Sequence, residues 1–582
     1  MKKGLKIAIA ILLVVVLLFA GVVGLFLYNL SNTKVSMTEN SAMSWNNEMV
    51  MDSVKGDMYS ASDGFFGGIA ENIMGAVGSG VVGSATMDEI YMEPELKSEF
   101  NTSEYEDVKE KGFLNVRMSP LSTFAADVDT GSYTNFRGII RKELSGYSNY
   151  YYDLEGLHDI RIEEMVNYFD YSEGTDKDFT VTTEVAETPW NKDTKLLVVN
   201  VKAKELAPSE HKGSNLVFLV DVSGSMENED KLYLLIDSLE LLVDNLTEND
   251  TVSLVTYASS DRVVFEGLKG NQKEEILSAL NKLTAGGSTY GEGGIERAYE
   301  IAEKYKDGHS NSRIIMCSDG DLNVGMHSVD DLTDLIEKKR EKGIYLSVLG
   351  FGAGNYKDNR MEALADNGNG NYHYIDCLNE GNKVLVEDML STTVTLADDV
   401  KFQLEFNPAY IKGYRQIGYE NREMANEDFE DDTKDGGEVG YGHEVTVIYE
   451  IVPVESEMKI FEKDLKYQNT EIKNDSKDWL TVSVRHKPHG EKESILNEYV
   501  VDATSEKSEP SDNFKFISNV VAFGLLVNES DYIKDWDVDM VINNLKALNL
   551  EDEDKQDFLK LLDEYQIFVK QSNNTNNRVI ID

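Results

Sequence analysis

The chain has 582 residues, of which 105 are acidic and 56 are basic, so its formal net charge at pH 7 is −49. This surplus of negative charge argues against nucleic acid and anionic membrane surfaces as ligands, because both are bound by basic surfaces. The presence of only two cysteines excludes a disulfide scaffold and every multi-cysteine metal site. The length and a hydrophobic content of 41% predict several folded domains rather than a disordered chain.

The N-terminal residues predict a membrane anchor. An uncharged stretch spans residues 7–28 and follows Lys2, Lys3 and Lys6. As a helix it would be about 33 Å long, which is enough to cross a hydrocarbon core of about 30 Å. Lysines before the span are expected to stay in the cytoplasm, so the bulk of the chain is predicted to lie outside the cell membrane. A cleaved signal peptide with a long apolar core is the alternative, and it also exports the body of the chain.

The regions on either side of a central block differ in pattern. Residues 29–118 are rich in Ser, Asn, Met and Glu and predict a flexible, low-complexity stalk. Two helical patterns predict an N-terminal helical region at residues 119–177. Strand patterns at residues 178–213 and 398–500 predict a β-sandwich-like domain. Residues 501–571 predict a C-terminal helical region, and residues 572–582 predict a polar tail.

The central block, residues 214–397, alternates short apolar strands with helical patterns. Such alternation predicts an α/β fold, in which a doubly wound and mostly parallel sheet is covered by helices on both faces. Because strand patterns flank the block, we expect it to be inserted into a connection of the β-sandwich-like domain.

Three predicted strand-end loops of this block carry hydroxyl and carboxylate groups. The sequence DVSGSM provides Asp221, Ser223 and Ser225, a glycine-rich loop provides Thr289, and CSDGD provides Asp319. Ligands of doubly wound sheets bind at the carboxyl ends of the strands. Oxygen donors without His or Cys suit a hard cation. The five residues therefore predict a divalent-metal site, with Mg²⁺ as the expected ion and Mn²⁺ or Ca²⁺ as alternatives.

In this order, the three loops resemble the metal-ion-dependent adhesion site of von Willebrand factor A domains. The resemblance implies that Ser223, Ser225 and Thr289 coordinate the metal directly, whereas Asp221 and Asp319 act mainly through bound waters. An ion held by neutral hydroxyls keeps most of its positive charge. The resemblance therefore implies a protein partner that completes the metal shell with an Asp or Glu carboxylate.

Further segments resemble a family of bacterial cell-envelope proteins, in which a von Willebrand factor A domain lies between a characteristic N-terminal region and a C-terminal domain of unknown function. The resemblance spans Pro120 to Leu548 and implies a role in adhesion or envelope assembly. This chain has no lipoprotein cysteine, so we expect its N-terminal helix to anchor it instead. The segments that carry the resemblance are STFAADVDTGSYTNFR, RIEEMVNYFDY, FNPAYIKGYRQIGYENR and DGGEVGYGHEVTVIYEI.

Two other functions stay open beside partner binding. A metal-assisted hydrolase would use the same ion with Asp127 or Glu438 as general base. However, the sequence has no H-E-x-x-H, no G-x-S-x-G and no His–carboxylate cluster. A scaffold would fill the metal site with one of its own carboxylates. We expect a binding protein rather than an enzyme.

Asp127 and Asp129 also resemble the start of a calcium loop, with a turn of capped carboxylates as the alternative.

Three histidines and the two cysteines are interpreted as structural. His486 and His489 flank a proline and predict a solvent-exposed turn rather than a metal site, whereas His443 begins a predicted strand. Cys317 and Cys377 fall in different predicted strands, which predicts free thiols rather than a disulfide.

Overall fold

The structure is a computed structural model of the chain. It describes residues 109–146, 160–207, 212–288, 292–307, 311–320, 329–352, 358–388, 391, 393–434, 436–463, 472 and 476–579. These residues all belong to one compact unit. The predicted membrane span at residues 7–28 and the predicted stalk up to residue 108 lie outside them. Within the described ranges, no helix is both long enough and apolar enough to cross a bilayer.

A six-stranded sheet lies at the centre of the α/β part, in the order β10-β9-β8-β5-β6-β7. Neighbouring strands are parallel except for the antiparallel pair β6 and β7. Every residue of β5 and β9 is buried, as expected for strands that are covered on both faces. The predicted doubly wound, mostly parallel fold is therefore confirmed. The strands are β5 (Ser214–Asp221), β6 (Thr251–Tyr257), β7 (Asp261–Lys269), β8 (Asn311–Ser318), β9 (Ile344–Phe351) and β10 (Tyr372–Ile375).

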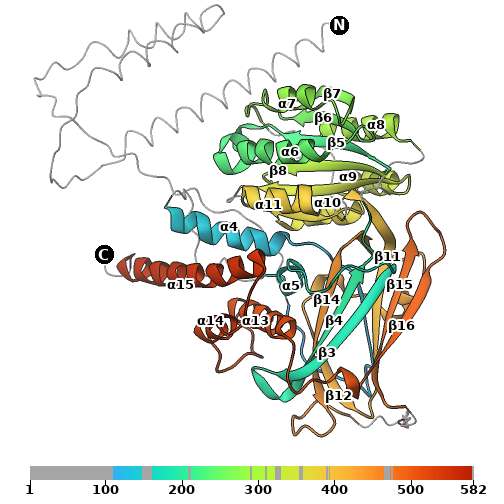
Figure 1. Cartoon of the computed structure of the whole chain (residues 1–582), viewed down its shortest axis with the longest axis vertical. Helices are drawn as coiled ribbons and strands as arrows, with labels where there is room; N and C mark the ends of the chain where they lie inside the picture. Colours follow the sequence, from blue (N-terminus) through green and yellow to red (C-terminus); the bar gives the residue numbers. More distant parts are fainter. Residues whose placement is uncertain are drawn as a thin grey trace, which may run out of the picture. The chain divides into compact units, whose positions relative to one another are not determined.

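Two layers of helices cover this sheet (Figure 1). Leu216, Phe218 and Val220 of β5 pack into one layer, and Val217 and Leu219 pack into the other, because successive strand residues point to opposite faces. The first layer contains α6 (Leu234–Asn245), α7 (Lys273–Leu280), α11 (Leu378–Asn382) and the short helix η4 (Lys383–Glu387). The second layer contains α8 (Glu292–Tyr305), α9 (Val329–Arg340) and α10 (Asp358–Asn367).

Strands before and after the α/β part form two antiparallel sheets. One has the order β1-β12-β14-β4-β3, and the other has the order β13-β11-β15-β16 with β2 paired to β11. Apolar side chains of both sheets share one core, so together the sheets form a β-sandwich. The α/β part leaves this sandwich after β4 and returns to it at β11. The strands are β1 (Leu114–Asn115), β2 (Leu121–Ala125), β3 (Phe179–Thr188), β4 (Asn191–Ala203), β11 (Thr395–Phe406), β12 (Ile411–Ile417), β13 (Gly437–Gly440), β14 (Glu444–Pro453), β15 (Asp478–Pro488) and β16 (Ile495–Asp502).

Helices from both ends of the described chain pack into a further apolar core, which also takes Leu196 and Val198 of β4. Figure 1 shows α15 beside α4, and the two helices are in contact. The N-terminal and C-terminal helical regions thus form one layer against the sandwich. The helices are α4 (Gly131–Ser145), α5 (Ile162–Asn167), α13 (Asp512–Val527), α14 (Val538–Lys546) and α15 (Glu553–Val579).

Three sequence predictions need correction. The predicted helical region at 119–177 includes strand β2, whose five residues are too few to show a clear alternation and are set by pairing with β11. The predicted polar tail at 572–582 is helical as far as Val579, because extending an existing helix adds a hydrogen bond per residue. His486 is a buried residue of β15 beside the ring of Phe179, since the turn begins only at His489. By contrast, both cysteines are free, as predicted.

Candidate metal-binding site

Asp221 is the last residue of β5, and its carboxylate fixes the loop that follows. Its Oδ1 accepts a hydrogen bond from the backbone N–H of Ser223 at 2.8 Å. Its Oδ2 accepts one from the hydroxyl of Ser318, the last residue of β8, at 3.3 Å. The Asp221 side chain is fully buried. The loop after β5 is therefore held against the end of the neighbouring strand.

The two serines of this loop point their hydroxyls at one another. The Oγ atoms of Ser223 and Ser225 are 2.9 Å apart. Ser223 is buried, whereas Ser225 is exposed at the start of a short helix, η2 (Gly224–Glu227). The pair thus presents two neutral oxygen donors, one of which faces solvent.

The glycine-rich loop lies directly against the DVSGSM loop. The N–H of Gly224 donates to the carbonyl of Gly287 at 2.9 Å, and the N–H of Gly286 donates to the carbonyl of Val222 at 2.8 Å. Gly287 has a φ of +87°, a conformation that glycine adopts without strain. Ser288 continues this loop. Thr289, the predicted third hydroxyl ligand, is the next residue in sequence and lies outside the described residues.

Asp319 follows β8, which pairs with β5 so that Val220 lies opposite Cys317. The two predicted carboxylates therefore come from adjacent strand ends. Asp319 is buried, and its Oδ2 accepts a hydrogen bond from Nζ of Lys231 at 2.7 Å. Lys231 carries no local signal in the sequence, since a lysine in an amphipathic helical pattern is usually a surface residue.

The electrostatics of this strand edge favour a cation. Burial raises the pKa of the Asp221 carboxyl to about 6, and the nearby Asp319 carboxylate adds to the rise. A bound cation would stabilise the charged form of both groups. Every predicted ligand that the structure describes offers oxygen, and the donors come together at adjacent strand ends. Asp221, Ser223, Ser225 and Asp319 therefore fit a hard divalent ion.

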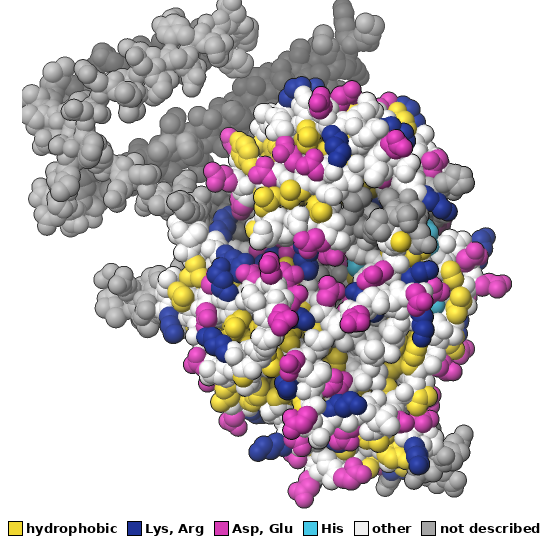
Figure 2. All heavy atoms as spheres, viewed as in Figure 1, with side chains coloured by type: hydrophobic (Ala, Val, Ile, Leu, Met, Phe, Trp, Pro, Cys, Tyr) yellow, Lys and Arg dark blue, Asp and Glu magenta, His cyan; other side chains and the backbone are white. Residues whose placement is uncertain are grey.

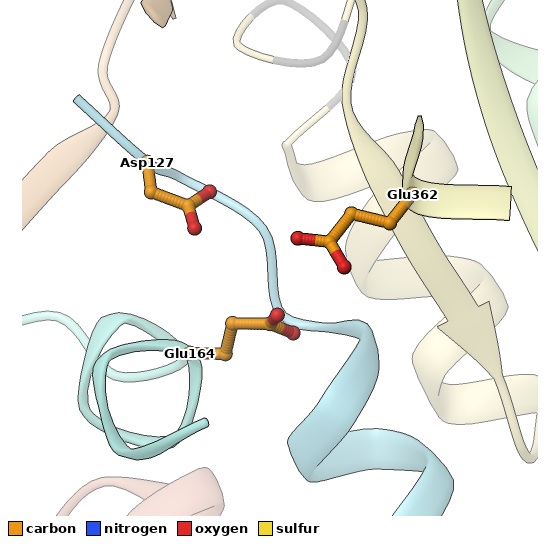
Figure 3. A group of neighbouring side chains, drawn as sticks. All are labelled: Asp127, Glu164 and Glu362. Atoms are coloured by element: carbon orange, nitrogen blue, oxygen red, sulfur yellow. The ribbon is translucent and has the colours of Figure 1, made fainter. Parts of the chain in front are cut away.

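A second group of carboxylates lies away from these loops. Asp127 precedes α4, Glu164 lies in α5, and Glu362 lies in α10. All three are buried, and oxygen atoms from the three side chains lie within 4.8 Å of one another. Figure 3 shows the carboxylates pointing toward a common point from separate segments of the chain. We call these residues the acidic junction. Only Asp127 was singled out from the sequence.

Two arginines contact the carboxylates of the acidic junction. Nε of Arg422 lies 3.0 Å from Oδ2 of Asp127, and its Nη2 lies 3.3 Å from Oε1 of Glu362. Arg161 contacts Glu164 and lies 2.8 Å from Oε2 of Glu362. The carboxylates are therefore occupied by guanidinium groups, and the acidic junction forms an ion network that joins three parts of the chain.

Both residues considered as general bases for a hydrolase are engaged. Asp127 contacts Arg422 and accepts the backbone N–H of Asp129. Glu438, in β13, accepts a hydrogen bond from the side chain of Asn369. His443 lies just before β14, and its Nδ1 accepts the N–H of Gly440, which is a structural role.

Comparisons with known proteins follow the parts of this fold. The family described as "von Willebrand factor" matches residues 99–198, "von Willebrand factor type A domain" matches 215–385, and "Uncharacterized protein YfbK, C-terminal" matches 391–568. The first range includes β3 and most of β4, and the second includes the six-stranded sheet from the second residue of β5. The third includes β11 to β16, α13, α14 and the part of α15 up to residue 568.

Similar proteins include the uncharacterized protein YfbK of Escherichia coli K12, which is 38% identical over 444 residues that cover 74% of this chain and 75% of YfbK. The uncharacterized protein sll0103 of Synechocystis is 26% identical over 162 residues, which cover 28% of this chain and 37% of that protein. A solved structure, von Willebrand factor type A from Catenulispora acidiphila, has a TM-score of 0.37 at 17% identity and covers 61% of this chain and 80% of that chain.

Proposed function

The chain belongs to the YfbK family of bacterial von Willebrand factor type A proteins, and from this premise we propose that it is a non-enzymatic binding protein that captures a protein partner through a divalent cation. Ser223 and Ser225, with Thr289, would hold the ion directly, and Asp221 and Asp319 would act through water. When bound, the ion supplies an electrophilic position that accepts an Asp or Glu carboxylate of the partner.

Support for metal-dependent capture comes chiefly from the loop after β5. Its two serine hydroxyls lie 2.9 Å apart, and the exposed one marks the side from which a partner can approach. A surface hollow of about 670 Å³ adjoins the same loop, with Val222, Thr256, Arg262 and Thr284 among its lining residues. If a carboxylate of the partner binds the metal, the residues next to that carboxylate in the partner would lie beside this hollow.

The charge of the chain gives the metal a further role. Acidic side chains are spread over the face seen in Figure 2, and the whole chain carries a net charge of −49. An acidic partner is repelled by such a surface at long range, so the metal is its one strong attraction. Salt screens charges over about 10 Å at 0.1 M, so moderate salt should leave the association rate unchanged or raise it.

Anchoring completes the proposal. Residues 7–28 span the cell membrane and present the rest of the chain outside it, where the protein works in adhesion or envelope assembly. Treatment of intact cells with protease is the direct test. Digestion of the α/β part in intact cells is expected, and complete protection there with digestion after lysis would contradict the proposed orientation.

Metal binding is tested by titrating the purified extracytoplasmic part, residues 94–582, with Mg²⁺ in a calorimeter. Asp221→Ala is expected to weaken binding by about 10- to 100-fold, as is usual for residues that orient metal ligands. Asp237→Ala removes an exposed carboxylate from α6 and serves as the matched control. Equal affinity in wild type and Asp221→Ala would overturn the proposed site.

Partner capture is then compared in Mg²⁺ and in EDTA, with wild type and Asp221→Ala as bait for envelope extracts. The proposal requires the same partner to be retained only by wild type in Mg²⁺. Retention that persists in EDTA would instead support the scaffold, whose site is filled by one of its own carboxylates.

A further inference from the structure

Lys231 places an ammonium group within the candidate metal site. Its Nζ lies 2.7 Å from Oδ2 of Asp319, and the side chains of the two residues are only 6% and 3% exposed. Lysine is almost never buried in this way without a specific partner. The residue lies in a short helical segment, η3 (Glu229–Tyr233), where its φ of −123° and ψ of −106° interrupt the helix that leads into α6.

A glycine on a third strand end makes room for this lysine. Gly352 follows β9 and has a φ of +75°. A Cβ atom at this position would lie 2.4 Å from both Cγ and Cε of Lys231, so the lysine stem passes directly over the glycine backbone. Only glycine allows both the conformation and the close approach. The lysine is therefore held in place by packing as well as by its ion pair.

We propose that Lys231 sets the charge of the metal site and makes the metal-loaded site favour an anionic ligand. This inference rests on the proposed function. Among the residues that the structure describes, the interacting carboxylates of Asp221 and Asp319 belong to the site, and the ammonium group cancels one of their charges. A divalent ion then leaves the site with a net positive charge, whereas without the lysine the site would be neutral.

Two opposite effects follow from this charge. The ammonium group repels the metal and holds Asp319, so it weakens metal binding. The positive charge that remains after loading attracts a partner carboxylate, so it strengthens capture of the ligand. A lysine with a merely structural role predicts a different sign, because its loss would disorder the loops and weaken both steps.

The test measures binding of Mn²⁺, detected by electron paramagnetic resonance, to wild type, Lys231→Gln and Lys401→Gln. Glutamine keeps a donor for Asp319 but removes the charge, and we expect it to tighten Mn²⁺ binding by about tenfold, since charges interact strongly in a partly buried site. Lys401 is the matched control. It is fully buried in β11 and pairs with Asp399 at 3.1 Å, outside the metal loops, so its substitution should not change Mn²⁺ affinity.

The second readout uses acetate as the carboxylate probe on the Mn²⁺-loaded proteins, followed by water-proton relaxation. Lys231→Gln is expected to bind acetate several-fold more weakly than wild type, and Lys231→Arg, which restores the charge, is expected to return both affinities toward wild type. Thermal unfolding confirms that each variant folds, and Lys231→Met provides a second neutral side chain if glutamine is not tolerated.

The outcomes separate the two proposals. If wild type binds Mn²⁺ and the neutral variants bind it equally or more weakly, the role of Lys231 is overturned while the metal site stands. If only the neutral variants bind Mn²⁺, the inference is supported in its strongest form. If none of the proteins binds Mn²⁺, the proposed metal-dependent function fails, and the inference fails with it.

Discussion

Two regions of this molecule gather buried carboxylates, and they differ in what neutralises the charge. At the metal site, Asp221 is held by a backbone N–H and a hydroxyl, both uncharged, and Asp319 pairs with the ammonium group of Lys231. At the acidic junction, Asp127 and Glu362 share the guanidinium group of Arg422, and Glu362 also contacts Arg161. Within the described residues, Asp221 thus accepts hydrogen bonds only from uncharged donors, beside the exposed hydroxyl of Ser225, whereas each carboxylate of the acidic junction contacts a guanidinium group.

The difference shows that a cluster of acidic residues does not by itself make a metal site. Guanidinium groups are strong, charged partners for carboxylates, and Arg422 and Arg161 each contact more than one of them. Neutral hydroxyls leave the charge uncompensated, so a divalent ion gains more there. We therefore expect the acidic junction to stabilise the arrangement of the three chain segments and the strand edge to bind ligand.

The largest expected effect is at the acidic junction. Arg422→Met removes a guanidinium group that contacts Asp366 and three buried carboxylates, and it leaves the buried three with less countercharge. The three are Asp127, Asp129 and Glu362. We expect the free energy of unfolding to fall by about 3–5 kcal/mol, measured by urea denaturation. A loss below about 1 kcal/mol would show that this network does not hold the junction together.

Metal should stabilise the molecule through one region only. Mg²⁺ at about 100 times its Kd should raise the free energy of unfolding by about 2.7 kcal/mol, because the ion binds the folded state. At the same Mg²⁺ concentration Asp221→Ala should reduce this gain to about 0.4–1.4 kcal/mol, as its 10- to 100-fold weaker binding requires, whereas Asp127→Asn should retain it. A gain that disappears in Asp127→Asn would place an ion at the acidic junction and remove the distinction between the two regions.

Glu163 is a buried carboxyl of a third kind, because within the described residues neither an arginine nor a hydroxyl group donates a hydrogen bond to it. Its carboxyl oxygens have no hydrogen-bond partner among the described residues. Burial, together with Glu420, Asp127 and Glu164, raises its pKa from 4.5 to about 8. A carboxyl whose pKa is raised by folding contributes stability at low pH, and that contribution is lost as the pH rises toward 8.

Glu163→Gln should therefore reduce the loss of stability between pH 5 and pH 6.5 by about 2 kcal/mol, because each unit of pKa difference corresponds to about 1.4 kcal/mol. Denaturant unfolding at a series of pH values measures the slope in wild type and variant. Parallel slopes would mean that Glu163 ionises in the folded protein as it does in the unfolded chain.

The smallest expected effect is at an exposed ion pair. Arg297 contacts Asp261 and Glu300, and the three side chains are exposed. Arg297→Met should change the free energy of unfolding by less than about 0.5 kcal/mol, because water already solvates these charges. The same urea measurement then calibrates the Arg422 result. A change of several kcal/mol here would mean that burial does not account for the contrast.

Much of the α/β part was predictable from the sequence because its signals are local. Buried parallel strands are short apolar runs, and DVSGSM places Asp221, Ser223 and Ser225 directly after the first of them. Pairing of β5 with β8 then brings Asp319 beside that loop. The site of Thr289 stays a prediction, because this residue lies outside the described part of the chain.

The features that the sequence did not reveal depend on contacts between distant segments. Burial of Lys231 requires the close approach of Gly352, which lies in a different strand-end loop. The acidic junction depends on Arg422, which contacts Asp127 and Glu362 although both are distant from it in the sequence. Strand β2 exists because β11 offers it a pairing edge, and its own five residues carry little pattern.

The insertion of the α/β part into the sandwich has a consequence for the order of folding. Strand β4 ends at Ala203 and pairs with β14, whose first residue is Glu444. Closing so long an unstructured loop is entropically unfavourable, although the penalty grows only with the logarithm of loop length. If the inserted part folds first, the chain between Ser214 and the start of β11 becomes one folded body. The loop that must be closed between β4 and β14 is then effectively shorter. We therefore expect the sandwich to assemble on an α/β part that is already folded.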